Sequence, residues 1–338
     1  MLGKRISKVV IVFLNYNGVK IKFGGKSILK QSLDSLENTA YKNYKIVAIN
    51  NGSTDTSKSE LKRRNIETIN IKKNIYNFSR ISNIGIRYAI KKYNPDYVMI
   101  YSNDVFVKDP NWLTEIVRVA DTENDAGIVA CKIIYPDGRL QSLGSLFIDG
   151  ECVGITQSTE KRYHSSIEAD MMPGCAFLIR KEAITKVGML DENFVMAYED
   201  LDYSLRMKRA GFKVLITDKS SIIHLSGFTN ASLQRMSINA QKIMTYKNMR
   251  SYLYFFDKNR NLLTAKERFS RAIKRFPLLF FGFTFTKMIP ASEKHIFGIK
   301  KYASLWNLWV ASKAIIDHNI DKMFNRDKKF EYYKKIRW

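Results

Sequence analysis

The sequence contains few cysteines and few histidines. This shortage limits the disulfides and the metal sites that the chain can form. Its 338 residues include four histidines and three cysteines, Cys131, Cys152 and Cys175, which are scattered without metal-binding spacing. An odd and sparse set of cysteines argues against a disulfide scaffold and indicates a reducing compartment, which we expect to be the cytoplasm.

Long hydrophobic runs are also missing. The run FPLLFFGFTF (276–285) has 10 residues, whereas a membrane-spanning helix needs about 20. With basic residues on both sides, this run is compatible with a position in the membrane interface. The N-terminal stretch KVVIVFLNYNG lacks a small-residue cleavage site and leads into a turn, so it predicts a strand and not a signal peptide.

Acidic residues are scarce relative to basic ones, and the excess lies at one end. The chain has 56 Lys and Arg against 32 Asp and Glu, a net charge of +24, and residues 239–338 hold 22 and 7 of these, a net charge of +15. Such a region attracts phosphates of nucleic acid or of an anionic membrane. It contains no recognised nucleic-acid motif. We expect it to dock on the inner face of a membrane, the alternative being a domain packed on the rest of the chain.

Apolar residues make up 45% of the chain and charged residues 26%, as in globular proteins. The first hundred residues alternate between apolar runs such as VVIVFL (9–14) and segments with helical spacing, a pattern typical of βαβ units and a mainly parallel sheet. Polar clusters follow three of these runs, at 15–17, 50–53 and 102–104. Ligands of such sheets bind at the carboxyl ends of the strands, which is where these clusters fall.

Beyond residue 112 the alternation is looser. The sequence predicts a helix at NWLTEIVRVA, a strand at AGIVACKIIY, a hairpin at the Pro-Asp-Gly turn, and a helix at AYEDLDYSLRMKRAG that Gly211 ends. After residue 230 it predicts mainly helix, without repeats or low-complexity segments.

Four groups of residues are candidates for a functional site, and each also has an ordinary structural explanation. The turn NNGSTDTS suits a nucleotide, or is a plain helix cap. Asp104, at a strand end, suits Mg²⁺ or Mn²⁺ against a diphosphate, or caps a turn. Glu199 and Asp200 follow the apolar stretch FVMAY and suit a general base, or only complement the helix dipole. His224 suits a metal ligand, or is a structural histidine.

The order of these segments is more specific than any one of them. VVIVFLNYNG, NNGSTDTS, NFSRISNIGIRYAI, YSNDVFVKDPNWL, PGCAFLIRKEAITKVG, AYEDLDYSLRMKRAGF and HLSG together resemble family 2 glycosyltransferases of the rhamnosyltransferase-like branch, over about residues 6–230. The resemblance implies a GT-A (Rossmann-like) α/β fold with a mainly parallel sheet flanked by helices, here followed by a mainly helical basic C-terminal extension. It also implies that a sugar is transferred, with inversion at its anomeric carbon, from a nucleotide-diphosphate sugar to a glycan or lipid-linked acceptor. The expected donor is UDP- or dTDP-linked, and the expected cofactor is Mn²⁺ or Mg²⁺.

The resemblance also assigns roles by position. Asp200 matches the catalytic base and Glu199 its acidic neighbour, while Asp104 and His224 match metal ligands. The positions that match the donor site are Asn15, Tyr16, Asn17, Asn50, Gly52, Ser53, Asp55, Arg80, Asn83, Asn103, Gly174 and Cys175.

Two positions depart from the family pattern. Asn50 stands where an Asp that recognises the base is usual, and Ser102 begins the DXD-type motif where Asp or Asn is commoner. An Asn both donates and accepts hydrogen bonds, so it can still pair with a pyrimidine edge.

The predicted organisation is a catalytic domain over 1–235, divided into a nucleotide-binding half (1–110) and an acceptor half (111–235), and a helical basic region over 236–338. Two other classes compete with a glycosyltransferase: a basic nucleic-acid-binding protein, and a sugar nucleotidyltransferase. The latter needs a Gly-rich loop with a nearby Arg or Lys after the first strand, which LNYNGVKIKFGG matches poorly.

Overall fold

The computed structural model of the chain describes residues 5–148, 151–156, 159–194, 197–225, 238–259 and 313–317. It divides into two units, the first formed by Met1–Asp191 and Glu199–Gly227, the second by Glu192–Tyr198 and Phe228–Trp338. Each unit is described separately below. The two stretches FPLLFFGFTF (276–285) and LWNLWV (305–310), which suggested membrane contact, lie outside the described residues.

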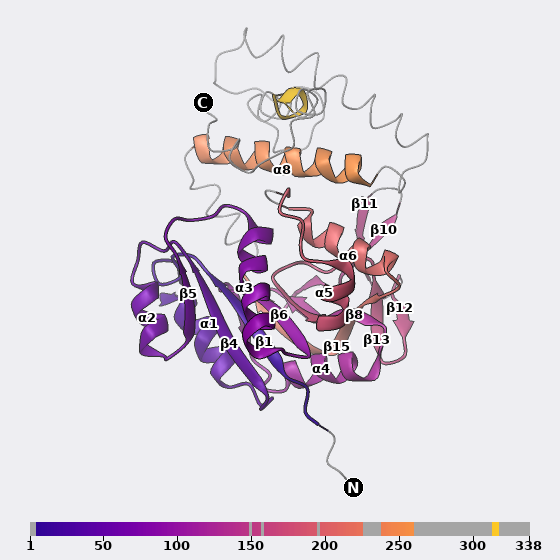
Figure 1. Ribbon diagram of the computed structural model, residues 1–338, viewed down its shortest axis with the longest axis horizontal. Coiled ribbons are helices and arrows are strands. Elements are labelled where there is room, and N and C mark those ends of the chain that lie inside the picture. Colours follow the sequence, from indigo (N-terminus) through magenta and orange to yellow (C-terminus); the bar gives the residue numbers. More distant parts are fainter. Residues whose placement is uncertain are drawn as a thin grey trace. The chain divides into compact units, whose positions relative to one another are not determined.

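The first unit is built on one mixed sheet of eleven strands (Figure 1). The nine-strand path runs β12-β13-β15-β8-β14-β6-β1-β4-β5, with β7 and β9 attached to β15 and β8. The strands are β1 (Val9–Asn15), β4 (Tyr44–Asn51), β5 (Glu67–Ile71), β6 (Tyr97–Ser102), β7 (Val105–Val107), β8 (Ala126–Ile134), β9 (Leu140–Ser142), β12 (Lys161–Tyr163), β13 (Ser166–Ala169), β14 (Ala176–Arg180) and β15 (Lys213–His224). Strands β5, β4, β1 and β6 are parallel, as the alternating N-terminal pattern predicts.

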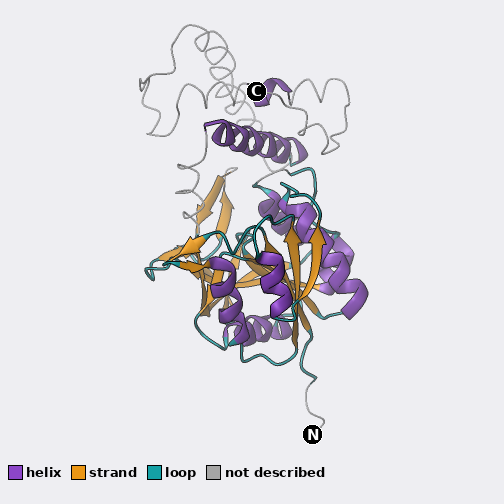
Figure 2. Ribbon diagram, turned by 90° about the vertical axis from the view of Figure 1, so that its left-hand side faces the viewer, coloured by secondary structure: helices purple, strands orange, loops and turns teal. Residues whose placement is uncertain are grey.

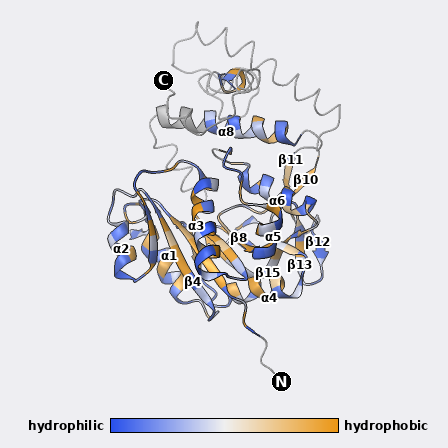
Figure 3. Ribbon diagram, viewed as in Figure 1, coloured by the Kyte–Doolittle hydropathy of each residue, from blue (hydrophilic) through white to orange (hydrophobic). Residues whose placement is uncertain are grey.

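Strand β1 lies between β6 and β4, and all of its residues are buried. Its continuous apolar run, VVIVFL, can only be accommodated where both faces of the sheet are covered. Figure 3 shows hydrophobic residues along the central strands and hydrophilic ones on the outer sides of the helices.

Helices cover both faces of the sheet (Figure 2). They are α1 (Ile28–Glu37), α2 (Ser57–Arg63), α3 (Phe78–Tyr93), α4 (Trp112–Thr122), α5 (Lys181–Val187) and α6 (Glu199–Arg209). Two two-stranded hairpins complete the unit: β2 (Lys22–Phe23) with β3 (Lys26–Ser27), and β10 (Ser145–Ile148) with β11 (Glu151–Gly154).

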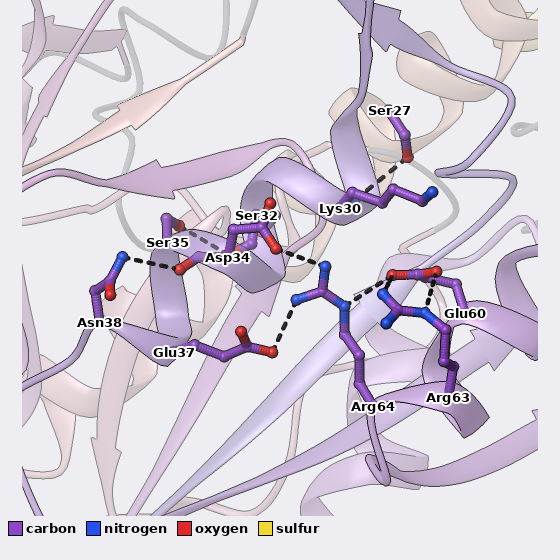
Figure 4. A network of polar contacts seen from close by, with 10 residues as sticks. All are labelled: Ser27, Lys30, Ser32, Asp34, Ser35, Glu37, Asn38, Glu60, Arg63 and Arg64. Atoms are coloured by element: carbon purple, nitrogen blue, oxygen red, sulfur yellow. Dashed lines mark hydrogen bonds and ion pairs between the residues drawn. The ribbon is translucent and has the colours of Figure 1, made fainter.

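Arg64, at the end of α2, ties this helix to α1 (Figure 4). Its guanidinium contacts Asp34 at 2.5 Å, Glu37 at 2.8 Å and Glu60 at 2.8 Å. Hydrogen bonds from Arg63 and Arg64 lower the pKa of Glu60 to about 2. The Glu60 carboxylate therefore stays charged over the whole working pH range and keeps Arg64 in place, while Arg64 makes the link to Asp34 and Glu37 of α1.

The described part of the second unit consists mainly of α8 (Ile238–Lys258). Aromatic side chains gather on it: the rings of Tyr252 and Phe256 lie 4.8 Å apart, and Tyr254 packs on Phe194 at 4.9 Å. Among the residues that the structure describes, no helix has both the length and the apolar character needed to cross a bilayer.

Candidate active site

The candidate site lies at the carboxyl ends of β1, β4 and β6. In the parallel register, Asn15 on β1 is the neighbour of Asn50 on β4, and Leu14 is the neighbour of Ser102 on β6. The three polar clusters that follow these strands therefore meet at one edge of the sheet, as expected for a ligand site of this architecture.

A chain of side-chain amides crosses this edge. Asn103 donates from Nδ2 to Oδ1 of Asn15 at 2.8 Å. Asn15 in turn donates to Oδ1 of Asn50 at 3.1 Å, and Asn50 donates to Oδ1 of Asn70 at 3.0 Å. Asn15, at the centre, is only 1% exposed. Because each amide donates to the next in the same direction, the chain links the ends of β1, β4 and β5 to the turn after β6 with neutral groups alone.

Ser53 joins the loop after β4 to the loop after β1. Its hydroxyl donates to Oδ1 of Asn50 at 2.6 Å and accepts from the backbone N–H of Asn17 at 3.0 Å. The side chain of Asn17 completes the link by accepting from the N–H of Thr54 at 2.8 Å. These hydrogen bonds join the loop after β1 to the loop after β4. They connect three residues that the resemblance assigns to nucleotide binding, Asn17, Asn50 and Ser53.

Tyrosines stand on the exposed side of this turn. Tyr16 and Tyr76 are both exposed, and the pKa of Tyr76 is raised by partial burial and by the neighbouring Tyr16. Beside them Gly52 has a φ of +67°, and a Cβ on it would lie 2.3 Å from the backbone nitrogen of Asn74. Only glycine fits this left-handed position, which lets the loop that carries Tyr76 approach the turn.

Asp55 is engaged with the backbone. It accepts hydrogen bonds from the N–H of Lys20 at 2.7 Å and of Ser57 at 3.0 Å. Burial by itself would raise the pKa of Asp55, but its hydrogen bonds to Ser57 and Lys20 lower it. The carboxylate thus fixes the turn that opens α2.

Two further predicted donor residues lie on α3. Arg80 is exposed in its first turn. Asn83 is buried, and its amide pairs with the backbone of Leu190, donating to the carbonyl at 2.8 Å and accepting from the N–H at 3.1 Å. Asn83 therefore holds the loop that follows α5, and it does not take part in the amide chain.

Asp104 and His224 are brought together by strand pairing. Strand β7 pairs antiparallel with β15, so that His224 opposes Val105, and the N–H of Leu225 donates to the carbonyl of Asp104 at 3.1 Å. The Oδ2 of Asp104 lies 3.5 Å from Nε2 of His224. Burial by itself would lower the pKa of His224, but Cys175 and Asp104 raise it to about 10.

Few side chains that could bind a metal ion lie around Asp104 and His224. Within the described residues, no group of three or more His, Cys, Asp or Glu side chains is placed to hold a metal ion. Hard divalent cations are nevertheless often held by one or two protein ligands together with substrate phosphates. A carboxylate and an imidazole 3.5 Å apart fit that arrangement once the imidazole releases the proton that Cys175 and Asp104 favour, because only a neutral imidazole binds a metal. Asp104 and His224 would then suit a cation that also binds the donor diphosphate.

The acid pair lies at the N-terminus of α6. Asp200 accepts hydrogen bonds from the N–H of Gly174 at 3.1 Å and of Leu201 at 2.8 Å. Burial raises the pKa of Asp200, while these hydrogen bonds favour its charged form. Burial and the charge of Asp200 raise the pKa of Glu199 to about 8, and the Oε2 of Glu199 is buried without a hydrogen-bond partner among the described residues. Burial and the neighbouring charge therefore favour the protonated form of Glu199.

The loop before β14 connects this acid pair to the metal position. Gly174 approaches α3 closely, since a Cβ on it would lie 3.2 Å from Phe78 and 3.6 Å from the Cβ of Asp200. The carbonyl of Cys175, the next residue, accepts from the N–H of Ser102 at 2.9 Å. One loop thus contacts both Asp200 and the segment that leads to Asp104.

Sequence reasoning does not single out Asn70 or Tyr76. Asn70 near the end of β5 pairs with Asn50 in the register, which a polar residue late in an apolar strand could have indicated. Tyr76 lies in a connecting segment, and only the fold brings it beside Tyr16.

The comparisons with known proteins agree with this architecture. The model of Glycosyl transferase family 2 matches residues 9–188. The chain is 24% identical over 216 residues to O-antigen biosynthesis protein RfbC of Myxococcus xanthus, covering 58% of this chain but 16% of that protein. It is also 24% identical over 224 residues to rhamnosyltransferase WbbL of Escherichia coli K12, covering 63% of this chain and 84% of that protein.

Solved structures share the fold at low sequence identity. A mannosyltransferase of Pyrobaculum calidifontis crystallised with GDP-Man and Mn²⁺ has a TM-score of 0.51 at 11% identity, covering 94% of this chain and 76% of that one. GalNAc-T7, crystallised with UDP, GalNAc and Mn²⁺, has a TM-score of 0.52 at 16% identity, covering 65% of this chain and 43% of that one. These likenesses confirm the GT-A fold expected from the sequence.

Proposed function

The chain belongs to glycosyl transferase family 2, and from that premise we propose that it is an inverting enzyme that moves a sugar from a nucleotide-diphosphate sugar to a hydroxyl of a glycan or lipid-linked acceptor. Its relatives named as a rhamnosyltransferase and as an O-antigen biosynthesis protein support the acceptor class. The GDP-Man and UDP named for fold relatives support the donor class. The family resemblance is the basis for expecting UDP or dTDP as the nucleotide, since the buried amide of Asn50 is engaged by Asn15, Ser53 and Asn70.

The observation that carries this proposal is the buried acid pair at the start of α6. Asp200 is held by two backbone N–H groups beside a Glu199 whose pKa is raised to about 8. A general base works best when its pKa is raised toward the working pH. Simple helix capping requires no buried second carboxyl, so it does not account for Glu199.

The reaction follows from these two groups. Asp200 takes the proton of an acceptor hydroxyl, and the oxygen forms a bond to the anomeric carbon on the face opposite the nucleotide diphosphate, whose bond to that carbon breaks. Glu199 remains protonated, which limits the negative charge in the buried pair to one. The backbone N–H of Gly174 keeps the Asp200 carboxylate oriented toward the acceptor.

Asp104 and His224 would hold a Mn²⁺ or Mg²⁺ ion in this mechanism. When bound, such an ion neutralises charge on the departing diphosphate. The turn formed by Asn17, Asn50 and Ser53 binds the nucleoside, and the exposed Tyr16 provides a face for the base. These residues therefore position the donor so that its anomeric carbon faces Asp200.

A nucleotide-release screen tests the proposal. UDP-, dTDP- and GDP-sugars are each incubated with the protein and a set of sugar acceptors, in Mg²⁺, in Mn²⁺ and in chelator. We expect one nucleotide class to be released only with metal, and the anomeric configuration of the product to be inverted by NMR. Retention of configuration would contradict the role of Asp200, and so would a turnover of Asp200→Asn close to that of the wild type.

Matched variants separate the two acids. Asp200→Asn keeps the size of the side chain but removes the base, so we expect transfer to fall by about 10²–10⁴-fold while donor binding persists. Glu199→Gln keeps a neutral side chain in place, as the proton on Glu199 does. We therefore expect a smaller loss, under about tenfold. An equal loss in both variants would show that the roles are assigned wrongly.

We also propose that the basic region over 236–338 binds the inner face of a membrane. Its support is the net charge of +15 over residues 239–338. Flotation with liposomes, with and without anionic lipid and across salt concentration, tests it. We expect salt-sensitive association with anionic liposomes only, and equal flotation with neutral liposomes would contradict the electrostatic basis.

A further inference from the structure

Phe78, the first residue of α3, lies against the loop that holds the catalytic base. A Cβ built on Gly174 would lie 3.2 Å from Cε1 and 3.3 Å from Cζ of Phe78. The same point lies 3.6 Å from the Cβ of Asp200. The edge of the Phe78 ring and the side chain of Asp200 therefore flank the same side of Gly174.

This packing bears on the base through one hydrogen bond. The backbone N–H of Gly174 donates to Oδ2 of Asp200 at 3.1 Å, while Oδ1 accepts from the N–H of Leu201 in the same helix at 2.8 Å. Of these two donors, Gly174 is the one that lies outside α6. Because a backbone N–H moves with its peptide plane, a ring that packs on Gly174 fixes the direction of this donor.

Phe78 is itself held from the nucleotide side of the site. Asn51, the last residue of β4, is 4% exposed. Its amide accepts from the N–H of Ile75 at 2.9 Å and donates to the carbonyl of the same residue at 3.0 Å. It also donates to Oδ1 of Asn74 at 2.9 Å. The loop that precedes α3 is therefore fastened to the strand end that Gly52 follows.

A short segment connects this anchor to Phe78. Tyr76 and Asn77 lie between Ile75 and Phe78. Asn77 is 2% exposed and caps α3, since its side chain accepts from the N–H of Arg80 at 2.8 Å. A buried amide thus fixes the segment at each end. The segment links the turn assigned to the nucleotide with the loop that holds the base, and all of these residues belong to the first unit.

We propose that Phe78, held by the segment that Asn51 anchors, is a positioning residue for the catalytic base, because its ring fixes the Gly174 N–H that orients Asp200. The proposal rests on the proposed glycosyl transfer, in which Asp200 takes the proton of the acceptor hydroxyl. A misplacement of about 1 Å in such a group can lower the rate about 10²-fold. Phe78 therefore acts on the rate of transfer and not on the affinity for the donor.

A cycle of variants with Asp200→Asn separates this role from simple support of the fold. Product formation by the whole 338-residue chain is measured with saturating acceptor and the nucleotide sugar found in the release screen. We expect Phe78→Ala to lower kcat at least tenfold when Asp200 is present. In the Asp200→Asn background it should lower kcat less than twofold, because no base remains to be positioned. The KM for the nucleotide sugar should change less than threefold.

Ile84 supplies the matched control on the same helix. Like Phe78, it is partly buried against the core of the first unit. Ile84→Ala should change kcat less than twofold in both backgrounds, since it affects the fold and not the base. Phe78→Leu keeps an apolar side chain and should follow the pattern of Phe78→Ala with smaller factors, so the test does not depend on the stability of the alanine variant.

Urea unfolding provides a second measurement that requires no catalysis. Gly174→Ala places a Cβ against the Phe78 ring, whereas in Phe78→Ala the same Cβ keeps only its ordinary contact of 3.6 Å with Asp200. We therefore expect Gly174→Ala to lower the urea midpoint of the wild type more than that of Phe78→Ala. Equal decreases in the two backgrounds would overturn the packing on which the proposal depends.

The kinetic cycle also distinguishes failure of this proposal from failure of the proposed function. A kcat of Phe78→Ala within twofold of the wild type would overturn the positioning role and leave sugar transfer standing. Losses of equal size with and without Asp200 would do the same. A turnover of Asp200→Asn close to that of the wild type would instead overturn the proposed function itself.

Discussion

The amide chain at the sheet edge predicts that Asn15 and Asn103 are energetically coupled. Asn15 is 1% exposed and accepts from Asn103 at 2.8 Å. Asn15→Ala removes that acceptor and also the donor to Asn50, although Asn50 keeps the hydroxyl of Ser53 at 2.6 Å. One neutral hydrogen bond contributes about 0.5–1.5 kcal/mol. We therefore expect Asn15→Ala to lower the free energy of unfolding by about 1–3 kcal/mol, and Asn103→Ala by about 1 kcal/mol.

A double-mutant cycle measured by urea unfolding isolates the contact. Because both single variants lose the same hydrogen bond, the double variant should lose about 1 kcal/mol less than the sum of the two. Donor binding should weaken in parallel, since Asn103 precedes the carboxylate of Asp104. Titration of the protein with the nucleotide sugar measures this second effect.

Asn70 supplies the matched control. It lies at the exposed end of the same chain, where water replaces a lost partner, so Asn70→Ala should change the free energy of unfolding by less than about 0.5 kcal/mol. If the losses in Asn15→Ala and Asn103→Ala add to within about 0.3 kcal/mol, the two amides are independent. The ordered chain would then be refuted as the element that aligns the strand ends.

Three further predictions concern charge. Arg64 and Glu60 are 10% and 8% exposed as side chains, whereas Arg63 is 65% exposed; Arg64→Ala should therefore lower the free energy of unfolding by about 2–4 kcal/mol, and Arg63→Ala by under about 1 kcal/mol, in urea unfolding. Asp104→Ala should raise the Mn²⁺ concentration for half-maximal activity at least tenfold, and an unchanged metal titration would exclude Asp104 as a ligand. Because the pKa of Glu199 is raised to about 8 in the folded state, the folded protein loses stability as pH rises from about 4.5 through 8. That loss should be absent in Glu199→Gln, and parallel stability curves of the two proteins would contradict the buried, protonated acid.

The regular elements of the first unit follow from local patterns. The run VVIVFL is buried throughout in β1, and the helix expected at AYEDLDYSLRMKRAG is α6. The small strands β7 and β10–β13 are not predicted, because three or four residues are too few to establish a period. Their partners, and not their own residues, determine that they are strands.

The site is predictable in its parts but not in its connections. Asn15, Asn50 and Asn103 were expected at strand ends because polar clusters follow apolar runs. That their amides form one directed chain depends on the register of three strands. His224 lies 120 positions from Asp104 in the sequence, and the pairing of β7 with β15 brings the two together. No local pattern encodes a contact between segments so far apart.

The sequence by itself determined the family, the longer strands and helices of the first unit, and which residues stand at the carboxyl ends of the N-terminal strands, because apolar periodicity and turn residues act over a few neighbours. Only the tertiary structure decided the environment of the acid pair and the contact between Asp104 and His224. The pKa of Glu199 depends on burial by every element around it, and the approach of His224 to Asp104 depends on the pairing of β7 with β15. Desolvation and strand register are properties of the assembled fold, so chemistry that depends on them cannot be obtained from local sequence.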